Sequence, residues 1–290
     1  METQQNKKNK NVVVLFIYPN VESYLEPLVL SLNNQTSKEY SVMIFNDGLK
    51  SAELLFENLD NNHQIINISG TIKEIRQEAF KLLKESDVGT IIFQDSDDFM
   101  SNNRVEVCLD YLKTYSLVCN DLDLIDTEGN LIREGYWTDR LSNSFIFDYN
   151  FIKKFNIVGL GNTAIRKELL DNEIQFSSDA IIALDWFIFY QLLEKSKEQG
   201  VFVNTCKTIY RQHQNNEVGL GEFSKKRLKH AINVKKAHYN ALNNVGFHFE
   251  NELNELEKIN TNQENFFKIN NNKSLFWWEE TEQNYEIVTK

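Results

Sequence analysis

The sequence predicts an α/β fold in which helices cover both faces of a mostly parallel central sheet. Three observations lead to this prediction. Continuous apolar runs, typical of strands buried on both faces, alternate with segments whose apolar residues recur at helical spacing. The runs end in polar turn sequences. The alternation continues from residue 12 to about residue 112, which is typical of a parallel sheet that binds ligands beyond the carboxyl ends of its strands.

The first strand is expected at residues 12–17, an unbroken apolar run that stops at Tyr18-Pro19-Asn20. The next segment changes period. Its apolar residues recur three and four positions apart from Leu25 to Leu32, which predicts a helix. A second strand is expected at residues 41–45 and ends at the turn sequence Asn46-Asp47-Gly48.

A third strand is expected at residues 64–68, followed by a helix from Ile72 to about Lys84. The fourth strand, at residues 89–94, leads the chain directly into Asp95. Apolar residues at helical spacing then predict a helix over residues 105–112.

The second half of the chain alternates less regularly. Residues 126–130 are typical of a turn between short strands. Residues 181–193 are almost wholly apolar and predict a helix, with Asp179 as its expected N-cap. We expect these segments to complete one domain that spans residues 11–223.

Lysines and arginines crowd a helix expected at residues 225–242, whose apolar residues form a short stripe. We expect residues 224–290 to be a helical extension with a weakly ordered end. Two interpretations of the basic helix remain open: a solvated charged face, or an interfacial helix that makes peripheral contact with an anionic membrane.

Composition excludes several classes of protein. The formal net charge of −11 argues against a nucleic-acid binder, which needs a broad basic face. The cysteines are odd in number and lack metal-ligand spacing, so we expect core residues in a reducing cytosol: Cys108, Cys119 and Cys206. The N-terminal apolar run is too short for a signal peptide or membrane span. We therefore expect a cytoplasmic protein, with contact at the inner face of the membrane as the basic helix's alternative.

The residues that indicate chemistry most sharply are Asp95-Ser96-Asp97-Asp98, directly after a buried strand. Carboxylates this close repel one another unless a cation offsets them. Mg²⁺ or Mn²⁺ bound to one or two carboxylates and to the oxygens of a substrate diphosphate fits this density of ligands. A solvated acidic turn is the alternative. A calcium loop is excluded, because Phe99 and Met100 occupy its fifth and sixth positions.

Four segments, in this order and spacing, resemble the successive motifs of family 2 inverting glycosyltransferases with the GT-A fold: residues 12–36, 44–48, 75–79 and 92–98. The resemblance covers roughly residues 11–215. It implies a nucleotide-sugar donor, a saccharide or lipid-linked acceptor, and a role in building cell-envelope polysaccharide.

The resemblance also assigns residues. It implies that Asp47 contacts the nucleobase, that Arg76 supports the nucleotide, and that Asp95 contacts ribose and metal together with Asp97. Tyr210-Arg211-Gln212-His213 resembles a late motif in which Arg211 faces the diphosphate and His213 approaches the metal. Asn20 belongs to the first nucleotide motif. Two of these motifs differ from the usual Pro-x-Tyr-Asn and Asp-Asp-Gly, which leaves the identity of the nucleobase open.

The resembling enzymes use as catalytic base a carboxylate that opens a late helix, and Asp185 matches that place. Its apolar neighbours should raise the pKa of Asp185, which suits a group that takes a hydroxyl proton. The alternative for Asp185 is helix capping. The family more often has two acids here, whereas Leu184-Asp185 keeps one.

Two other functions remain open. Asp95-Ser96-Asp97 after an apolar strand also resembles the nucleophile motif of haloacid-dehalogenase-like phosphatases, although that motif normally opens its domain and has Thr or Val in place of Phe99. A non-catalytic nucleotide-sugar-binding module is the third possibility. Asp185 separates it from an enzyme, because a binding module needs no base beside its ligand.

Overall fold

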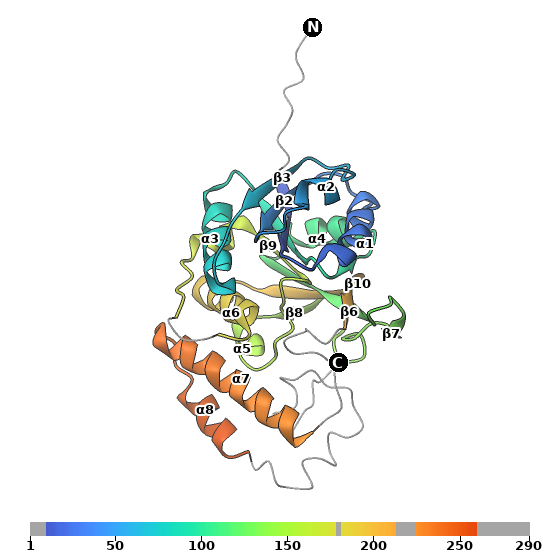
Figure 1. Cartoon of the computed structure of the whole chain (residues 1–290). Coiled ribbons are helices and arrows are strands. Elements are labelled where there is room, and N and C mark those ends of the chain that lie inside the picture. Colours follow the sequence, from blue (N-terminus) through green and yellow to red (C-terminus); the bar gives the residue numbers. More distant parts are fainter. Residues whose placement is uncertain (1–9, 178–180, 213–223, 260–290) are drawn as a thin grey trace.

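The computed structural model describes residues 10–177, 181–212 and 224–259 (Figure 1). Helices lie on both faces of one twisted sheet. The strands are β1 (Asn11–Ile17), β2 (Ser41–Asn46), β3 (His63–Asn67), β4 (Thr90–Asp95), β5 (Phe99–Met100), β6 (Leu117–Ile125), β7 (Leu131–Arg133), β8 (Phe145–Phe147), β9 (Thr163–Arg166) and β10 (Gly200–Arg211). The helices are α1 (Glu22–Asn33), α2 (Ala52–Leu55), α3 (Ile72–Glu85), α4 (Arg104–Tyr111), α5 (Tyr149–Ile152), α6 (Leu184–Ser196), α7 (Lys225–Asn244) and α8 (Glu250–Glu257), with a 3-10 helix at Lys167–Asp171.

The sheet order is β3-β2-β1-β4-β9-β6-β10-β5, with β7 beside β6 and β8 beside β10. Strands β1 to β4 pair in parallel, as do β6 and β10. Strand β9 runs antiparallel between β4 and β6, so these two share the direction of β1. The predicted α/β fold is confirmed, and the carboxyl ends of β1, β2, β4, β6 and β10 meet at one edge of the sheet.

Each face of the sheet carries its own apolar core, because successive side chains of a strand point to opposite faces. Val13 and Leu15 of β1 pack in the cluster that includes α1 and α4. Val12 and Val14 pack in the cluster that includes α3, α6 and α7. The three cysteines are buried free thiols in these clusters, which confirms their prediction as core residues.

Helix α6 begins later than expected. It starts at Leu184, and its N-cap is Ala183, without a side-chain cap. The prediction that Asp179 caps this helix is therefore wrong. Capping is also not the role of Asp185, which lies in the first turn. Helix α3, by contrast, begins with a complete capping box between Thr71 and Glu74, which fixes its first turn.

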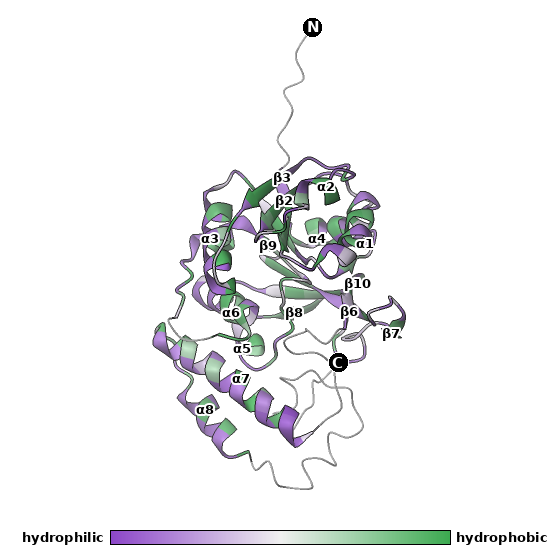
Figure 2. Cartoon of the chain, viewed as in Figure 1, coloured by the Kyte–Doolittle hydropathy of each residue, from purple (hydrophilic) through white to green (hydrophobic). Residues whose placement is uncertain are grey.

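The apolar stripe of α7 is buried against the rest of the protein. Leu228, Tyr239 and Leu242 are at most 2% exposed and belong to the same core as α6. Full burial of each such side chain contributes about 1.5–3 kcal/mol, so this stripe stays packed on the protein. The stripe is therefore covered by the protein and is not exposed to a membrane surface, and the outer face of α7 is polar (Figure 2). In the described ranges no helix has the length and apolarity to cross a membrane.

Candidate active site

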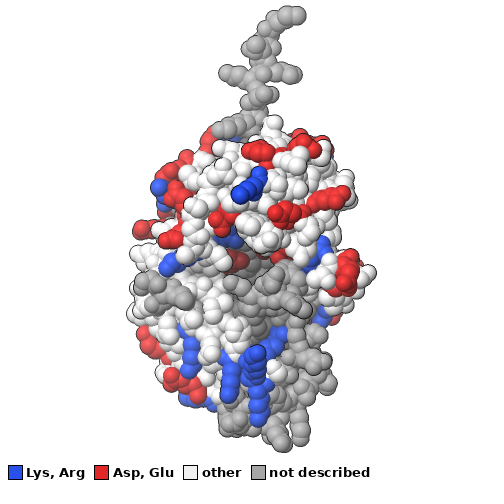
Figure 3. Space-filling model, in the orientation of Figure 1, with Lys and Arg blue, Asp and Glu red and all other residues white. Residues whose placement is uncertain are grey.

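A cavity of about 500 Å³ opens at the edge where the parallel strands end. Asp95 at the end of β4, Arg76 on α3 and Asp185 on α6 all line it. Figure 3 shows this face of the molecule, which is hollowed near its middle. Three segments that are far apart in the sequence thus bring two carboxylates and one guanidinium group to the same cavity.

The acidic turn after β4 holds carboxylates whose negative charge is only partly offset by hydrogen bonds and neighbouring positive charge. Asp98 is 1% exposed, and its Oδ1 accepts a 2.7 Å hydrogen bond from Arg211 N. Its Oδ2 has no hydrogen-bond partner within the described part of the chain. Burial, then the charges of Asp97 and Asp95, raise the pKa of Asp98. Burial, then Asp97 and Asp185, raise the pKa of Asp95 to about 7.

The backbone of Gly161 presses directly against these carboxylates. A Cβ atom at this position would lie 2.7 Å from Asp95 Oδ2 and 3.4 Å from Asp98 Oδ2. No side chain fits there without moving Asp95. Glycine is therefore required at this position, because only a residue without a side chain lets the backbone come this close to Asp95.

Arg76 supplies positive charge between the acids. Its guanidinium lies 3.4 Å above the ring of Phe16, a cation–π contact. Its Nε has no hydrogen-bond partner among the described residues. Burial lowers the pKa of Arg76, and the charges of Asp185 and Asp95 act in the opposite direction. Arg76 is thus a cation held in the cavity with hydrogen-bonding capacity to spare.

Asp185 lines the cavity from the first turn of α6. Its Oδ2 accepts a 3.0 Å hydrogen bond from Leu160 N. Burial raises the pKa of Asp185, while Arg76 and the Leu160 N–H lower it. A partly desolvated carboxylate in an open cavity is suited to accept a proton.

Asp47 and Asn20, which were also assigned from the sequence, follow β2 and β1 at the same edge of the sheet, although neither is among the residues that line the cavity. Asp47 is half-buried at the end of β2, where the side chain of Asn46 shapes the turn by accepting from Leu49 N at 2.8 Å. Asn20 follows β1 with φ of 76°, a left-handed conformation that asparagine tolerates. His213 lies outside the described residues.

Arg211 is 5% exposed at the end of β10. Its guanidinium donates to three backbone carbonyl oxygens at 3.1–3.2 Å, those of Asp97, Asp126 and Thr127. Its backbone N–H donates to Asp98. Arg211 therefore ties the acidic turn to the turn between β6 and β7.

A divalent cation fits the chemistry of the acidic turn. Among the residues the structure describes, no group of three or more His, Cys, Asp or Glu side chains is arranged as a complete metal site. The unpartnered Oδ2 of Asp98 and the raised pKa of Asp95 nevertheless mark carboxylates that lack positive charge. Mg²⁺ and Mn²⁺ use few protein carboxylates when substrate phosphates supply further oxygens.

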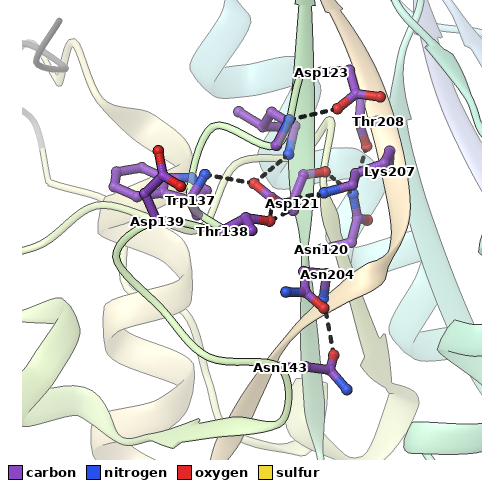
Figure 4. A network of polar contacts seen from close by, with 12 residues as sticks. Asn120, Asp121, Asp123, Trp137, Thr138, Asp139, Asn143, Asn204, Lys207 and Thr208 are labelled. Atoms are coloured by element: carbon purple, nitrogen blue, oxygen red, sulfur yellow. Dashed lines mark hydrogen bonds and ion pairs between the residues drawn. The ribbon is translucent and has the colours of Figure 1, made fainter. Parts of the chain in front are cut away.

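A second polar cluster, which the sequence did not indicate, supports the wall of the cavity. Asp121 on β6 is fully buried and accepts hydrogen bonds from Trp137 N at 2.7 Å, Thr138 Oγ1 at 2.6 Å and Lys207 Nζ at 2.7 Å. Figure 4 shows these groups converging between β6 and β10. Because Trp137 lines the cavity, Asp121 fixes the shape of that wall.

The loop at residues 157–162 was also missed, although it touches both acids. The Leu160 N–H donates a hydrogen bond to Asp185, and Gly161 leaves room for Asp95 because it has no side chain. The sequence signal that could have drawn attention to it is Gly159-Leu160-Gly161-Asn162.

Comparison with known proteins shows the family to which the chain belongs. The sequence profile of glycosyl transferase family 2 matches residues 12–172, more than half of the chain. The chain therefore belongs to glycosyl transferase family 2. The predicted family, its GT-A fold and the class of enzyme, a glycosyltransferase, are confirmed.

Curated relatives are consistent with this membership. The chain is 35% identical to chondroitin synthase of Escherichia coli over 138 residues, which is 44% of this chain but only 20% of that protein. It is 25% identical to dTDP-rhamnosyl transferase RfbG of Shigella flexneri over 243 residues, 76% of this chain and 79% of that protein.

Among solved structures, the fold is similar to that of TarS from S. aureus, crystallised as residues 1–349 with UDP-GlcNAc. The TM-score is 0.58 at 16% identity, over 85% of this chain and 70% of that one. At this identity the similarity shows the fold alone.

Proposed function

We propose that this enzyme transfers a sugar from a nucleoside-diphosphate sugar to an acceptor hydroxyl, with inversion and with a divalent cation. One observation carries the proposal: Asp95, Arg76 and Asp185 line the same cavity at the strand ends. A binding module would have no need for Asp185 there, and membership of a glycosyltransferase family sets aside the phosphatase alternative.

In the proposed reaction Asp185 accepts the proton of the acceptor hydroxyl. The acceptor oxygen forms a bond to the anomeric carbon as the bond from that carbon to the diphosphate oxygen breaks. Attack from the side opposite the leaving group inverts the configuration. Burial keeps the basicity of Asp185 above that of an ordinary carboxylate.

The departing diphosphate gathers negative charge, which Arg76 offsets from the cavity wall. Asp95 and Asp97 would hold a Mg²⁺ or Mn²⁺ ion, with His213 proposed as a third ligand, and the ion would supply further charge stabilisation for the diphosphate. Arg211 would support this arrangement by holding the acidic turn in place.

Asp47 is proposed to select the nucleobase. A carboxylate only accepts hydrogen bonds, so it suits the N3–H that uracil and thymine share. The relatives agree with this choice, since a TarS structure contains UDP-GlcNAc and RfbG is named a dTDP-rhamnosyl transferase. Asn20 would close the same nucleotide pocket from the end of β1.

The acceptor is proposed to be a saccharide, free or lipid-linked, as in polysaccharide synthesis. Since the apolar stripe of α7 is buried, any peripheral membrane contact would depend on its exposed lysines, such as Lys226 and Lys229. Binding to anionic liposomes at low but not high salt would support this contact, and no binding at low salt would remove it.

The central experiment separates binding from chemistry with Asp185→Asn. UDP and dTDP, each with and without Mn²⁺, are first tested by calorimetry to identify the nucleotide. Donor affinity should be nearly unchanged in the variant, whereas release of nucleoside diphosphate should slow about 100-fold or more, the usual scale for losing a general base. Equal turnover in both proteins would rule out Asp185 as the base.

A further inference from the structure

The loop at residues 157–162 contacts both ends of the proposed reaction site. Leu160 N donates to Asp185 Oδ2 at 3.0 Å. The next residue, Gly161, leaves room for Asp95 Oδ2 only because it has no side chain. Two adjacent residues of one loop therefore lie against two acids from different elements: Asp185 on α6, the proposed base, and Asp95 at the end of β4.

The loop is held in its conformation by Asn162, which is 5% exposed. Asn162 Oδ1 accepts from Gly159 N at 2.9 Å, and its Nδ2 donates to the carbonyl oxygens of Ile157 and Asn120 at 3.0 Å. These bonds close the loop on itself and attach it to β6. The backbone of the loop has little freedom to shift.

A hydroxyl group on β10 also holds this loop in place. Thr208 is fully buried, and its Oγ1 donates to Gly161 O at 2.8 Å. The same oxygen accepts from Asn120 Nδ2 at 3.0 Å (Figure 4). Asn120 Oδ1 in turn accepts from Arg104 Nε at 2.6 Å. Arg104 also donates to Gln94 Oε1 at 2.7 Å, next to Asp95. A continuous buried chain of hydrogen bonds thus links the loop to the strand that carries Asp95.

We infer that this loop is a rigid spacer that sets the position of Asp185 relative to Asp95, and that Thr208 and Asn162 are positioning residues for sugar transfer. The inference rests on the proposed function. The amide of Asn162 and the hydroxyl of Thr208 are both engaged in hydrogen bonds to backbone groups of the protein itself. Both act through the backbone of residues 159–161, which contacts the two acids.

The test uses Thr208→Val in the full-length chain, because valine keeps the shape of threonine and removes its hydroxyl. UDP affinity in the presence of Mn²⁺ should stay within about twofold, whereas kcat for release of nucleoside diphosphate should fall about 10- to 100-fold, as misplaced reacting groups do. Thr208→Ser keeps the hydroxyl and should restore kcat. The donors are UDP-GlcNAc and dTDP-rhamnose, whichever the wild type cleaves.

Thr205→Val is the matched control, since Thr205 lies on the same strand with an exposed side chain. It should behave as the wild type. Placing Thr208→Val on an Asp185→Asn background should cause little further loss, because Thr208 acts through Asp185. Full kcat in Thr208→Val, or a full additional loss in the double variant, would overturn the spacer inference.

Failure of the spacer inference is distinguishable from failure of the proposed function. If Asp185→Asn loses turnover and Thr208→Val does not, only the spacer is wrong. If the wild type cleaves neither donor, the proposed donors are wrong, and hydrogen exchange of the Leu160 amide decides the spacer. That amide should exchange faster in Thr208→Val than in Thr205→Val, and equal exchange would refute the inference.

Discussion

Replacing Gly161 with alanine should weaken cation-dependent nucleotide binding while leaving the fold intact. The added Cβ atom would lie 2.7 Å from Asp95 Oδ2, whereas ordinary van der Waals contact begins at 3.4 Å. The carboxylate would therefore move by about 0.7 Å, the difference between these two distances. Because the displaced atom is the end of a side chain, the change should affect the ligand that Asp95 holds more than it affects folding.

The size of the effect follows from that displacement. A misplacement of about 1 Å can cost about 100-fold in function, so a shift of about 0.7 Å predicts a loss of about 25-fold, or about 1.9 kcal/mol of binding free energy. Calorimetry with UDP or dTDP, with and without Mn²⁺, measures the dissociation constant. Thermal unfolding of the ligand-free protein should show a midpoint close to that of the wild type.

Two other glycines provide controls. At Gly89 an added Cβ meets nothing closer than 3.6 Å, so Gly89→Ala should bind as the wild type does. At Gly200 it would lie 2.6 Å from the ring of Phe147, so Gly200→Ala should unfold more easily without a change in the affinity of the folded protein. If Gly161→Ala binds the nucleotide and Mn²⁺ as tightly as Gly89→Ala, the close contact with Asp95 has no role in binding.

Three further predictions concern charge. Asp97→Ala should remove the cation-dependent part of nucleotide binding and leave ligand-free stability unchanged or slightly higher, because it relieves crowding beside Asp95; an unchanged Mn²⁺ requirement in calorimetry would contradict this. Mn²⁺-dependent UDP affinity should rise as pH increases through about 7, since the raised pKa keeps Asp95 protonated below that value and a protonated acid is a poor ligand; equal affinity at about pH 6 and about pH 8 would be the contrary result. His238→Phe should raise the free energy of unfolding by about 1 kcal/mol, because both ring nitrogens are buried without hydrogen-bond partners in the described structure. The gain should grow as pH falls below 6.5, where the unfolded chain binds a proton that burial denies to His238 by lowering its pKa; urea unfolding at about pH 5 and about pH 7.5 checks the sign.

The first half of the fold was predictable because its signals are local. Residues 12–17, 41–45 and 89–94 are apolar runs with polar ends, and the strands β1, β2 and β4 match them within one residue. Strand β9 was not predicted. It has four residues and pairs on both sides with strands from elsewhere in the chain, so its existence depends on tertiary contacts.

The start of α6 shows a different limit. The apolar pattern begins at Ile181, but residues 181–183 line the cavity and the helix begins at Leu184. Apolar side chains occur both in cavity walls and on buried helix faces. The hydrophobic pattern alone therefore does not show where the wall ends and the helix begins.

The acids of the site were predictable from position, since Asp95 follows a buried strand and Asp185 opens an apolar helix. Their spacer was not. Leu160 contributes a backbone N–H and Gly161 contributes the lack of a side chain. Neither contribution depends on a reactive side chain, and the residues they approach are distant in the sequence.

The buried cation beneath the site explains how so many acids are tolerated. Arg104 is fully buried, and its hydrogen-bond partners among the described residues are neutral: Gln94, Asn120 and the Phe93 carbonyl. Its charge is therefore not consumed by an ion pair and lowers the pKa of Asp95 from a distance. Burial and the neighbouring carboxylates still outweigh it, because the pKa of Asp95 remains near 7. The ligand-free site thus lacks positive charge, and this deficit, which costs stability, would favour binding of the proposed cation together with the diphosphate.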